Sequence, residues 1–146
     1  MNLKITRVSP TAKLPTRATS GSAGYDLYAD LPSPFLLKAG ERALIPTGVA
    51  IALQSREIGA FVYARSGLSS KHGITMANGV GVVDSDYRGE LKVPVVNLSQ
   101  TDYSIEPGER IAQLVLHPVI PYELEEVSTL DETQRGSGGF GSSGRK

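Results

Sequence analysis

Glycine and proline recur so often along this 146-residue chain that they leave no room for a long helix. The sequence contains 16 glycines and nine prolines. Both residues interrupt helices, since glycine costs about 1 kcal/mol and proline about 3 kcal/mol relative to alanine in a helix interior. The chain is therefore expected to fold into short elements joined by turns.

Short runs of β-branched, aromatic and aliphatic residues lie between these breaks. Val49, Ile51 and Leu53 alternate with alanines, which is the period of a β-strand. Pro94 lies inside a later run, and because proline cannot donate to a β-ladder it predicts an edge strand or a bulge there. Further strands are expected at Phe61–Tyr63, Leu91–Val95 and Ile111–Leu116.

Turn signals separate the predicted strands. Asn78-Gly79 is typical of a hairpin turn, and Pro107-Gly108 predicts another turn. One short helix is expected, between Ser66 and His72. Many short strands at close spacing indicate an all-β sandwich, jelly roll or small barrel with at most one short helix.

Charge and composition exclude several classes of function. Fifteen basic residues balance 15 acidic ones, and there is no cysteine. Zinc–thiolate sites and disulfide scaffolds are therefore excluded, and a nucleic-acid partner is not expected because that needs a basic stripe. The N-terminus lacks the apolar core of a secretory signal, and no apolar run reaches the roughly 18 residues of a membrane span. A cytoplasmic protein without a membrane partner is expected.

The C-terminal segment differs in character from the rest. Residues 1–130 are expected to form one β domain, and 131–146 a flexible, Gly/Ser-rich lid. The stretch from Arg135 to Gly144 has five glycines, three serines and a lone Phe140. Composition alone fits a flexible terminus, but free backbone N–H groups with an arginine and an aromatic residue also suit a phosphate beside a flat base.

Four further clusters carry groups suited to nucleotide chemistry, although each has an ordinary structural explanation. Arg65, Ser66 and Gly67 offer three donors to one phosphate, or form a plain surface turn. Asp84 follows an apolar run, where it is either a carboxylate beside a ligand or a turn-forming residue. Read alone, Asp26 is a turn or solvated residue and Gln113 faces solvent from a strand.

Taken together and in order, these segments resemble the five motifs of the homotrimeric dUTP diphosphatase (dUTPase) family. The resemblance extends from about residue 2 to 144. The matching segments are AGYDLYA from Ala23, ARSGLSS from Ala64, NGVGVVDSDYRGE from Asn78, PGERIAQL from Pro107 and RGSGGFGSSG from Arg135.

The resemblance implies a distorted jelly roll of the β-clip, dUTPase-like type that assembles as a homotrimer. Three active sites would lie at subunit interfaces, with the tail of one copy closing each. The implied reaction is hydrolysis of dUTP to dUMP and pyrophosphate, which supplies dUMP for dTMP synthesis and keeps uracil out of DNA.

The same resemblance assigns roles to individual residues. Asp84 would be the general base that activates water for attack on the α-phosphorus, with Gln113 near the α-phosphate. Magnesium would bridge the triphosphate oxygens, and Asp26 would act on it through water or serve as a structural partner of the site. Arg110 would make an intersubunit ion pair or touch the ligand.

The remaining implied contacts divide among phosphate, base and sugar. Tyr87 would stack on the deoxyribose, and Phe140 of the tail would cover the uracil. Phosphates would be held by Arg65, Ser66, Gly67, Arg135, Gly138, Ser142 and Ser143, and the uracil edge would be read by Asn78 and the backbone of Gly81, Val82, Val83 and Lys92.

Two alternatives remain open at this point. One is a dCTP deaminase-type relative. The zinc deaminase signature, which needs cysteine, is absent from this chain, and its two histidines, His72 and His117, have no assigned role. The other is a catalytically silent nucleotide-binding oligomer, which would be free to lose Asp84, Tyr87, Arg135 or Phe140.

Overall fold

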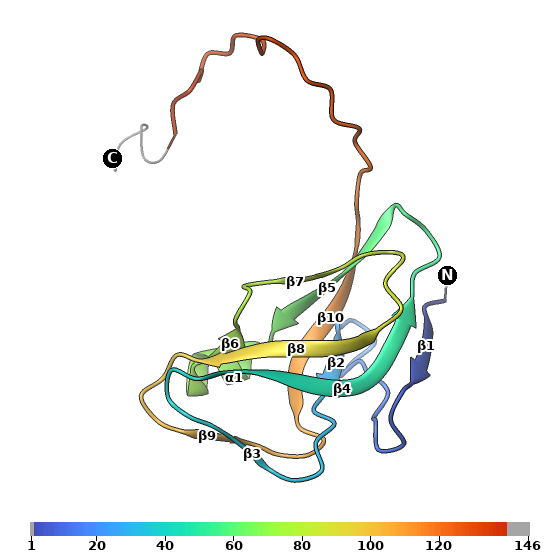
Figure 1. Ribbon diagram of the computed structural model, residues 1–146, viewed down its shortest axis with the longest axis vertical. Coiled ribbons are helices and arrows are strands. Elements are labelled where there is room, and N and C mark those ends of the chain that lie inside the picture. Colours follow the sequence, from blue (N-terminus) through green and yellow to red (C-terminus); the bar gives the residue numbers. More distant parts are fainter. Residues whose placement is uncertain (1, 140–146) are drawn as a thin grey trace.

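The computed structural model describes residues 2–139 and shows an antiparallel all-β fold (Figure 1). Within that range the chain forms ten strands and one short helix. The elements are β1 (Lys4–Arg7), β2 (Tyr25–Tyr28), β3 (Phe35–Leu37), β4 (Arg42–Ala52), β5 (Ile58–Ala64), α1 (Ser66–His72), β6 (Ile74–Met76), β7 (Gly81–Val83), β8 (Glu90–Asn97), β9 (Tyr103–Ile105) and β10 (Arg110–Pro118).

Two four-stranded sheets enclose one hydrophobic core. The first sheet has the order β1-β4-β8-β6 and the second the order β2-β10-β5-β7, while β3 and β9 form a separate pair. Residues from both sheets join one buried cluster, in which Val49 and Val93 of the first sheet and Leu27 and Ala60 of the second are fully buried. The expected all-β jelly roll with one short helix is confirmed.

The helix α1 forms where it was predicted, at Ser66–His72. Gly73 ends it with a φ of 69°, the left-handed conformation that glycine adopts without strain, and its N–H bonds back to the Ser69 carbonyl. Leu68 is the buried residue that packs this single helix onto the core.

Pro94 does not mark an edge strand, so that prediction is wrong. Strand β8 lies inside the first sheet, between β4 and β6, and the irregularity in the β4–β8 pairing falls between Pro46 and Ala50 instead. The Pro94 carbonyl accepts from Ala77 N–H, just beyond the end of β6 at Met76. The nitrogen of Pro94 points to the same side of β8 as its carbonyl. Because β6 has ended there, no backbone N–H is needed from this residue to continue the sheet.

The Asn78-Gly79 turn forms, but it does not connect a hairpin. Gly79 has a φ of 73°, and its N–H bonds to the Met76 carbonyl. The strands on either side belong to different sheets, since β6 pairs with β8 and β7 pairs with β5. The turn therefore carries the chain from one sheet to the other.

The chain leaves the body of the fold after β10. The Val119 N–H still bonds to the Glu57 carbonyl at 2.8 Å, and beyond it the chain runs away from both sheets (Figure 1). Ile120, Tyr122 and Leu124 are at least three-quarters exposed. Among residues 2–139, no helix has the length and apolar character needed to cross a membrane.

Candidate active site

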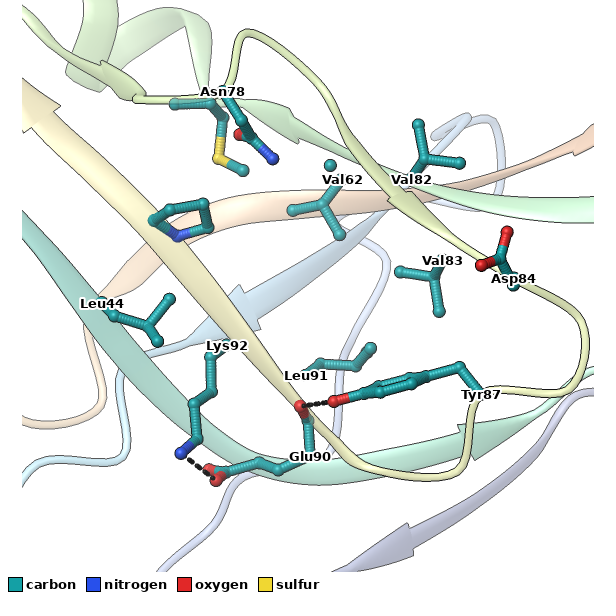
Figure 2. Close-up of a pocket in the computed structure, with 13 residues that line it drawn as sticks. Leu44, Val62, Asn78, Val82, Val83, Asp84, Tyr87, Glu90, Leu91 and Lys92 are labelled. Atoms are coloured by element: carbon teal, nitrogen blue, oxygen red, sulfur yellow. Dashed lines mark hydrogen bonds and ion pairs between the residues drawn. The ribbon is translucent and has the colours of Figure 1, made fainter.

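A pocket of about 330 Å³ lies where the second sheet's edge strand faces the first sheet. Figure 2 shows its side chains converging from both sheets. The first sheet contributes residues of β4, β6 and β8, and the second contributes β5 and β7. We call it the base pocket; it is lined by Leu44, Val62, Met76, Asn78, Gly81, Val82, Val83, Asp84, Tyr87, Glu90, Leu91, Lys92 and Pro94.

Strand β7 gives this pocket a backbone edge. In the strand order of the described residues, β7 pairs with β5 on one side only. A Cβ at Gly81 would lie 3.1 Å from the Cβ of Val62, so glycine lets β7 approach β5 closely. An unpaired strand edge presents N–H and C=O groups in a fixed order, which is the chemistry needed to read the edge of a planar base.

Tyr87 closes one end of the pocket. Its hydroxyl donates to the Glu90 carbonyl at 3.0 Å (Figure 2). Glu90 is itself tied to β4, because its carboxylate accepts from Gly48 N–H at 2.9 Å, and its other oxygen lies 3.6 Å from Lys92 Nζ. Glu90 was not among the predicted site residues, because the sequence does not show that its carboxylate contacts Gly48 of β4.

Asp84 is the first residue after β7, as predicted, and its carboxylate is exposed. It lines the base pocket and also a second hollow of about 460 Å³, shared with Arg56, Phe61 and Val119. The carboxylate is therefore open to ligand atoms approaching from either side of β7.

A separate pocket of about 300 Å³, distinct from both hollows beside β7, lies at the ends of β2, β5 and β10. Its lining is rich in hydrogen-bond donors and small residues, which suits an anion. We call it the phosphate pocket; it is lined by Ala18, Ser22, Ala23, Gly24, Asp26, Arg65, Ser66, Gly67 and Gln113.

Asp26 holds two arginines at this pocket. Its Oδ1 lies 2.9 Å from Arg65 Nε and its Oδ2 lies 3.2 Å from Arg110 Nη1. Arg65 also donates to the Arg110 carbonyl at 3.2 Å. The Asp26 side chain is only 13% exposed, so these contacts fix the direction of the Arg65 guanidinium. Arg110, which had two open roles, pairs with Asp26 of its own chain.

Gln113 has a defined amide orientation. Its Nε2 donates to the Ala64 carbonyl at 3.0 Å, so its Oε1 faces the other way, toward Gly24. A Cβ at Gly24 would lie 3.1 Å from that oxygen, which explains the glycine at this position. Gln113 pairs with Asp26 on β2 and Tyr63 on β5, and so stands between the two strands that supply the pocket.

The predicted site residues fall into two separate groups. The two pockets share no lining residue. Arg135 and Gly138 lie on the part of the chain that follows Val119, which we call the extended segment. There Arg135 Nε donates to the Gly138 carbonyl at 2.8 Å. Phe140, Ser142 and Ser143 lie outside the described residues.

The donor chemistry for a metal ion is sparse in the protein itself. Residues 2–139 contain no group of three or more His, Cys, Asp or Glu side chains that could hold one. Both oxygens of Asp26 already accept from arginines. This donor set fits magnesium in its common protein setting, where substrate phosphates and water supply most of the oxygen ligands.

Comparison with known proteins gives a consistent result. A family model described as dUTPase matches residues 10–144. The deoxyuridine 5'-triphosphate nucleotidohydrolase of Enterobacter sp. (strain 638) is 52% identical over 140 residues, 96% of this chain and 92% of that protein. That of Desulfitobacterium hafniense (strain DSM 10664 / DCB-2) is 51% identical over 138 residues, covering 94% of this chain and 91% of that one.

Solved structures that resemble this chain are also described as dUTPases. The dUTPase of Staphylococcus bacteriophage 80alpha with dUpNHpp is 30% identical, with a TM-score of 0.88 over 98% of both chains. The dUTPase of phage phi11 of S. aureus, whose structure is described as revealing the coordination of a structural Mg(II) ion, is 25% identical. Its TM-score is 0.81 over 90% of this chain and 100% of that one.

Proposed function

The chain belongs to the dUTPase family and is a dUTP nucleotidohydrolase, and from that premise we propose that each active site joins the base pocket of one copy to the phosphate pocket of another. The observation that carries this proposal is the separation of the two pockets in a single chain. One pocket has a base-reading edge and a carboxylate, and the other has the fixed cation. Neither holds a complete set of groups for hydrolysing a nucleotide.

An apolar row on the outer face of the second sheet supports contact between copies of the chain. The outer face of the second sheet carries a row of apolar side chains, Val82, Phe61 and Val115, which are neighbours across β7, β5 and β10. Val82 is 66% exposed in the single chain. Gln113 lies on the same face, two residues before Val115, so this row runs from the β7 edge toward the phosphate pocket. We propose that it packs against another copy in a homotrimer.

In the proposed mechanism the base pocket selects uracil. The free edge of β7 at Gly81, Val82 and Val83 pairs with the uracil edge, helped by the Asn78 amide and the Lys92 backbone. Cytosine presents the opposite donor and acceptor order and would leave buried groups unpaired. Tyr87 covers the deoxyribose, leaving no space for a 2′-hydroxyl.

Asp84 acts as the general base. Its exposed carboxylate accepts a proton from a water molecule, and the resulting nucleophile attacks the α-phosphorus in line with the departing pyrophosphate. Gln113 presents its Oε1 toward the phosphate pocket, where it orients the same water as an acceptor. The products are dUMP and pyrophosphate.

The phosphate pocket of a second copy grips the triphosphate. Arg65 supplies the charge, and Ser66 and Gly67 at the start of α1 supply donors from the hydroxyl and backbone. Asp26 serves here as the structural partner that aims Arg65 rather than as a metal ligand, because both of its oxygens are already engaged by guanidinium groups. A magnesium ion carried by the triphosphate would supply charge neutralisation here, and it would need few direct ligands from the protein.

The extended segment is proposed to act as a lid. The chain from Val119 onward runs clear of its own body, which leaves it free to reach a neighbouring copy (Figure 1). The proposal places Arg135, Gly138, Ser142 and Ser143 on the γ-phosphate and Phe140 over the uracil. In the cell this reaction would supply dUMP for dTMP synthesis and keep uracil out of DNA.

Hybrid oligomers test the shared site directly. Asp84→Asn inactivates the base pocket and Arg65→Ala inactivates the phosphate pocket, so each variant alone should have little activity. When the two are unfolded, mixed in equal amounts and refolded together, intact pockets from different chains meet in about a quarter of all sites. Recovery of about that share of wild-type activity is expected.

Two controls sharpen this experiment. Mixing the two variants after each has been folded separately should recover no activity before subunits exchange. Sedimentation equilibrium of the wild type should give three times the chain mass of 15.5 kDa. A hybrid as inactive as its parents would show that both pockets serve the same chain, contrary to the proposal.

A further inference from the structure

Gly89 lies directly beneath the ring of Tyr87. A Cβ built at Gly89 would lie 2.6 Å from Tyr87 Cζ and 3.0 Å from its Cε2, and closer still to the hydroxyl oxygen. Cβ atoms in proteins essentially never lie within 3.0 Å of a heavy atom outside their own residue and its two chain neighbours. The ring can therefore occupy its observed position only if residue 89 has no side chain.

The fold itself does not require glycine here. The φ of Gly89 is outside the left-handed region, unlike that of Gly79 or Gly108, so other residues could adopt its backbone conformation. The three heavy atoms nearest to the added Cβ all belong to the Tyr87 side chain. A larger residue would therefore displace the tyrosine ring and leave the strands where they are.

Among the described residues, the Tyr87 side chain makes one hydrogen bond, and displacement of the ring would break it. Tyr87 is 45% exposed, and its hydroxyl donates to the Glu90 carbonyl at 3.0 Å. That carbonyl is held in place because the Glu90 carboxylate accepts from Gly48 N–H of β4. Gly89 leaves room for the ring and Glu90 provides the fixed acceptor, and together they set the height of the ring above the backbone. Figure 2 shows the contact between Tyr87 and Glu90.

We propose that Gly89 is a positioning residue for sugar selection, acting through Tyr87. The inference rests on the proposed function, in which Tyr87 covers the deoxyribose and excludes a 2′-hydroxyl. A side chain at residue 89 lifts the ring, loosens its contact with the sugar and opens space beside the 2′ carbon. Selectivity for dUTP over UTP therefore depends on the missing side chain of Gly89.

The test compares kcat/KM for dUTP and UTP, each with magnesium, in full-length Gly89→Ala. The ratio of the two values should fall about tenfold or more, which is the usual effect of a poorly fitting group on discrimination. The thermal midpoint and circular dichroism should match the wild type. Gly21→Ala is the matched control, since Gly21 has no left-handed φ and its nearest contact would be Thr19 Oγ1 at 3.9 Å; its ratio should not change.

A double-mutant cycle separates positioning from a general structural effect. In a Tyr87→Ala background, Gly89→Ala should leave the dUTP/UTP ratio unchanged, because the ring it displaces is gone. A further fall of the ratio in that background overturns the proposal. So does a wild-type ratio in Gly89→Ala when Tyr87→Ala alone lowers it. A wild-type ratio in Tyr87→Ala instead overturns the proposed sugar contact on which the inference rests.

Discussion

Asp84 is an exposed carboxylate at the end of β7. Among the described residues its carboxylate accepts no hydrogen bond and joins no ion pair, whereas the Asp26 carboxylate engages two arginines. Its position at the end of β7 places it beside the strand edge that we propose to read the base. The two aspartates thus have different environments, one suited to proton transfer and one to orientation.

Asp84→Asn should remove the general base and retain the shape of the pocket. We expect kcat to fall by about 10²–10⁴-fold, the usual contribution of general-base catalysis, while dUTP binding measured by calorimetry is retained. Asp86→Asn is the control, because Asp86 is an exposed carboxylate on the same turn. Wild-type kcat in Asp84→Asn would exclude the proposed role.

Residue-level prediction from the sequence succeeds where the signal is local. An apolar run followed by Asp-Ser-Asp predicts that Asp84 lies where a strand gives way to a turn, and in the structure Asp84 is the first residue after β7. Asp26 is different, because its partners Arg65 and Arg110 are 39 and 84 residues away in the chain. No local pattern carries that information, and the two ion pairs appear only once β2, β5 and β10 have been assembled.

At the scale of elements, local patterns predict turns and strands better than they predict partners. The α1 helix and the Pro107-Gly108 turn form as expected. The Asn78-Gly79 turn also forms, yet its flanking strands join different sheets. The edge strand predicted from Pro94 was wrong for the same reason. A missing N–H shows only that one side of the strand lacks a donor, and on that side β6 has already ended.

Tyr103, the first residue of β9, has a raised pKa and contacts the turn that follows the strand. Tyr103 donates its hydroxyl to Glu109 at 2.5 Å, and the other Glu109 oxygen accepts from Glu106 N–H at 2.9 Å. Burial and the hydrogen bond to the Glu109 carboxylate raise the pKa of Tyr103 to about 12. The neutral tyrosine is thus favoured in the folded state.

This pKa predicts how the contact depends on pH. Because the folded pKa is raised, the stabilisation by Tyr103 should be complete below the unfolded tyrosine pKa of about 10 and be lost as pH rises to 12. Ultraviolet titration should show one of the six tyrosines ionising near pH 12, and Tyr103→Phe should remove that step. In Tyr122→Phe, where the ring is 81% exposed, the step should persist. If the step near pH 12 were lost in Tyr122→Phe, the assignment of that step to Tyr103 would be wrong.

At the scale of the whole molecule, the extended C-terminal segment should be dispensable for folding but needed for turnover. A chain that ends at residue 134 keeps every strand, since β10 ends at Pro118. We expect its circular dichroism and sedimentation to match the wild type, while kcat falls by about 10²-fold because the triphosphate is less well positioned. A chain lacking only Arg145 and Lys146 serves as the control. Unchanged kcat in the shorter chain would refute the lid.

The composite site could not have been predicted from composition or periodicity. These patterns describe one chain, and the separation of the two pockets becomes visible only in three dimensions. The ordered motifs lead to the proposal of shared sites, because their resemblance to the dUTPase family implies them. Balanced charge was equally uninformative by itself. Two arginines, Arg65 and Arg110, share the single carboxylate of Asp26, and such a local excess of positive charge suits a polyanionic ligand without making the chain basic.

The base pocket lies at the seam between the two sheets, with Leu44, Leu91 and Pro94 on one wall and Val62 and the β7 backbone on the other. Its width is therefore set by the packing of the buried residues that hold the sheets together. We expect warming, or a cavity made far from the ligand at Val93, to widen the seam before the strands separate. If this pocket selects the base as proposed, errors in base choice should appear at temperatures below the melting transition, and fidelity would depend on the interior of this protein as well as on its active site.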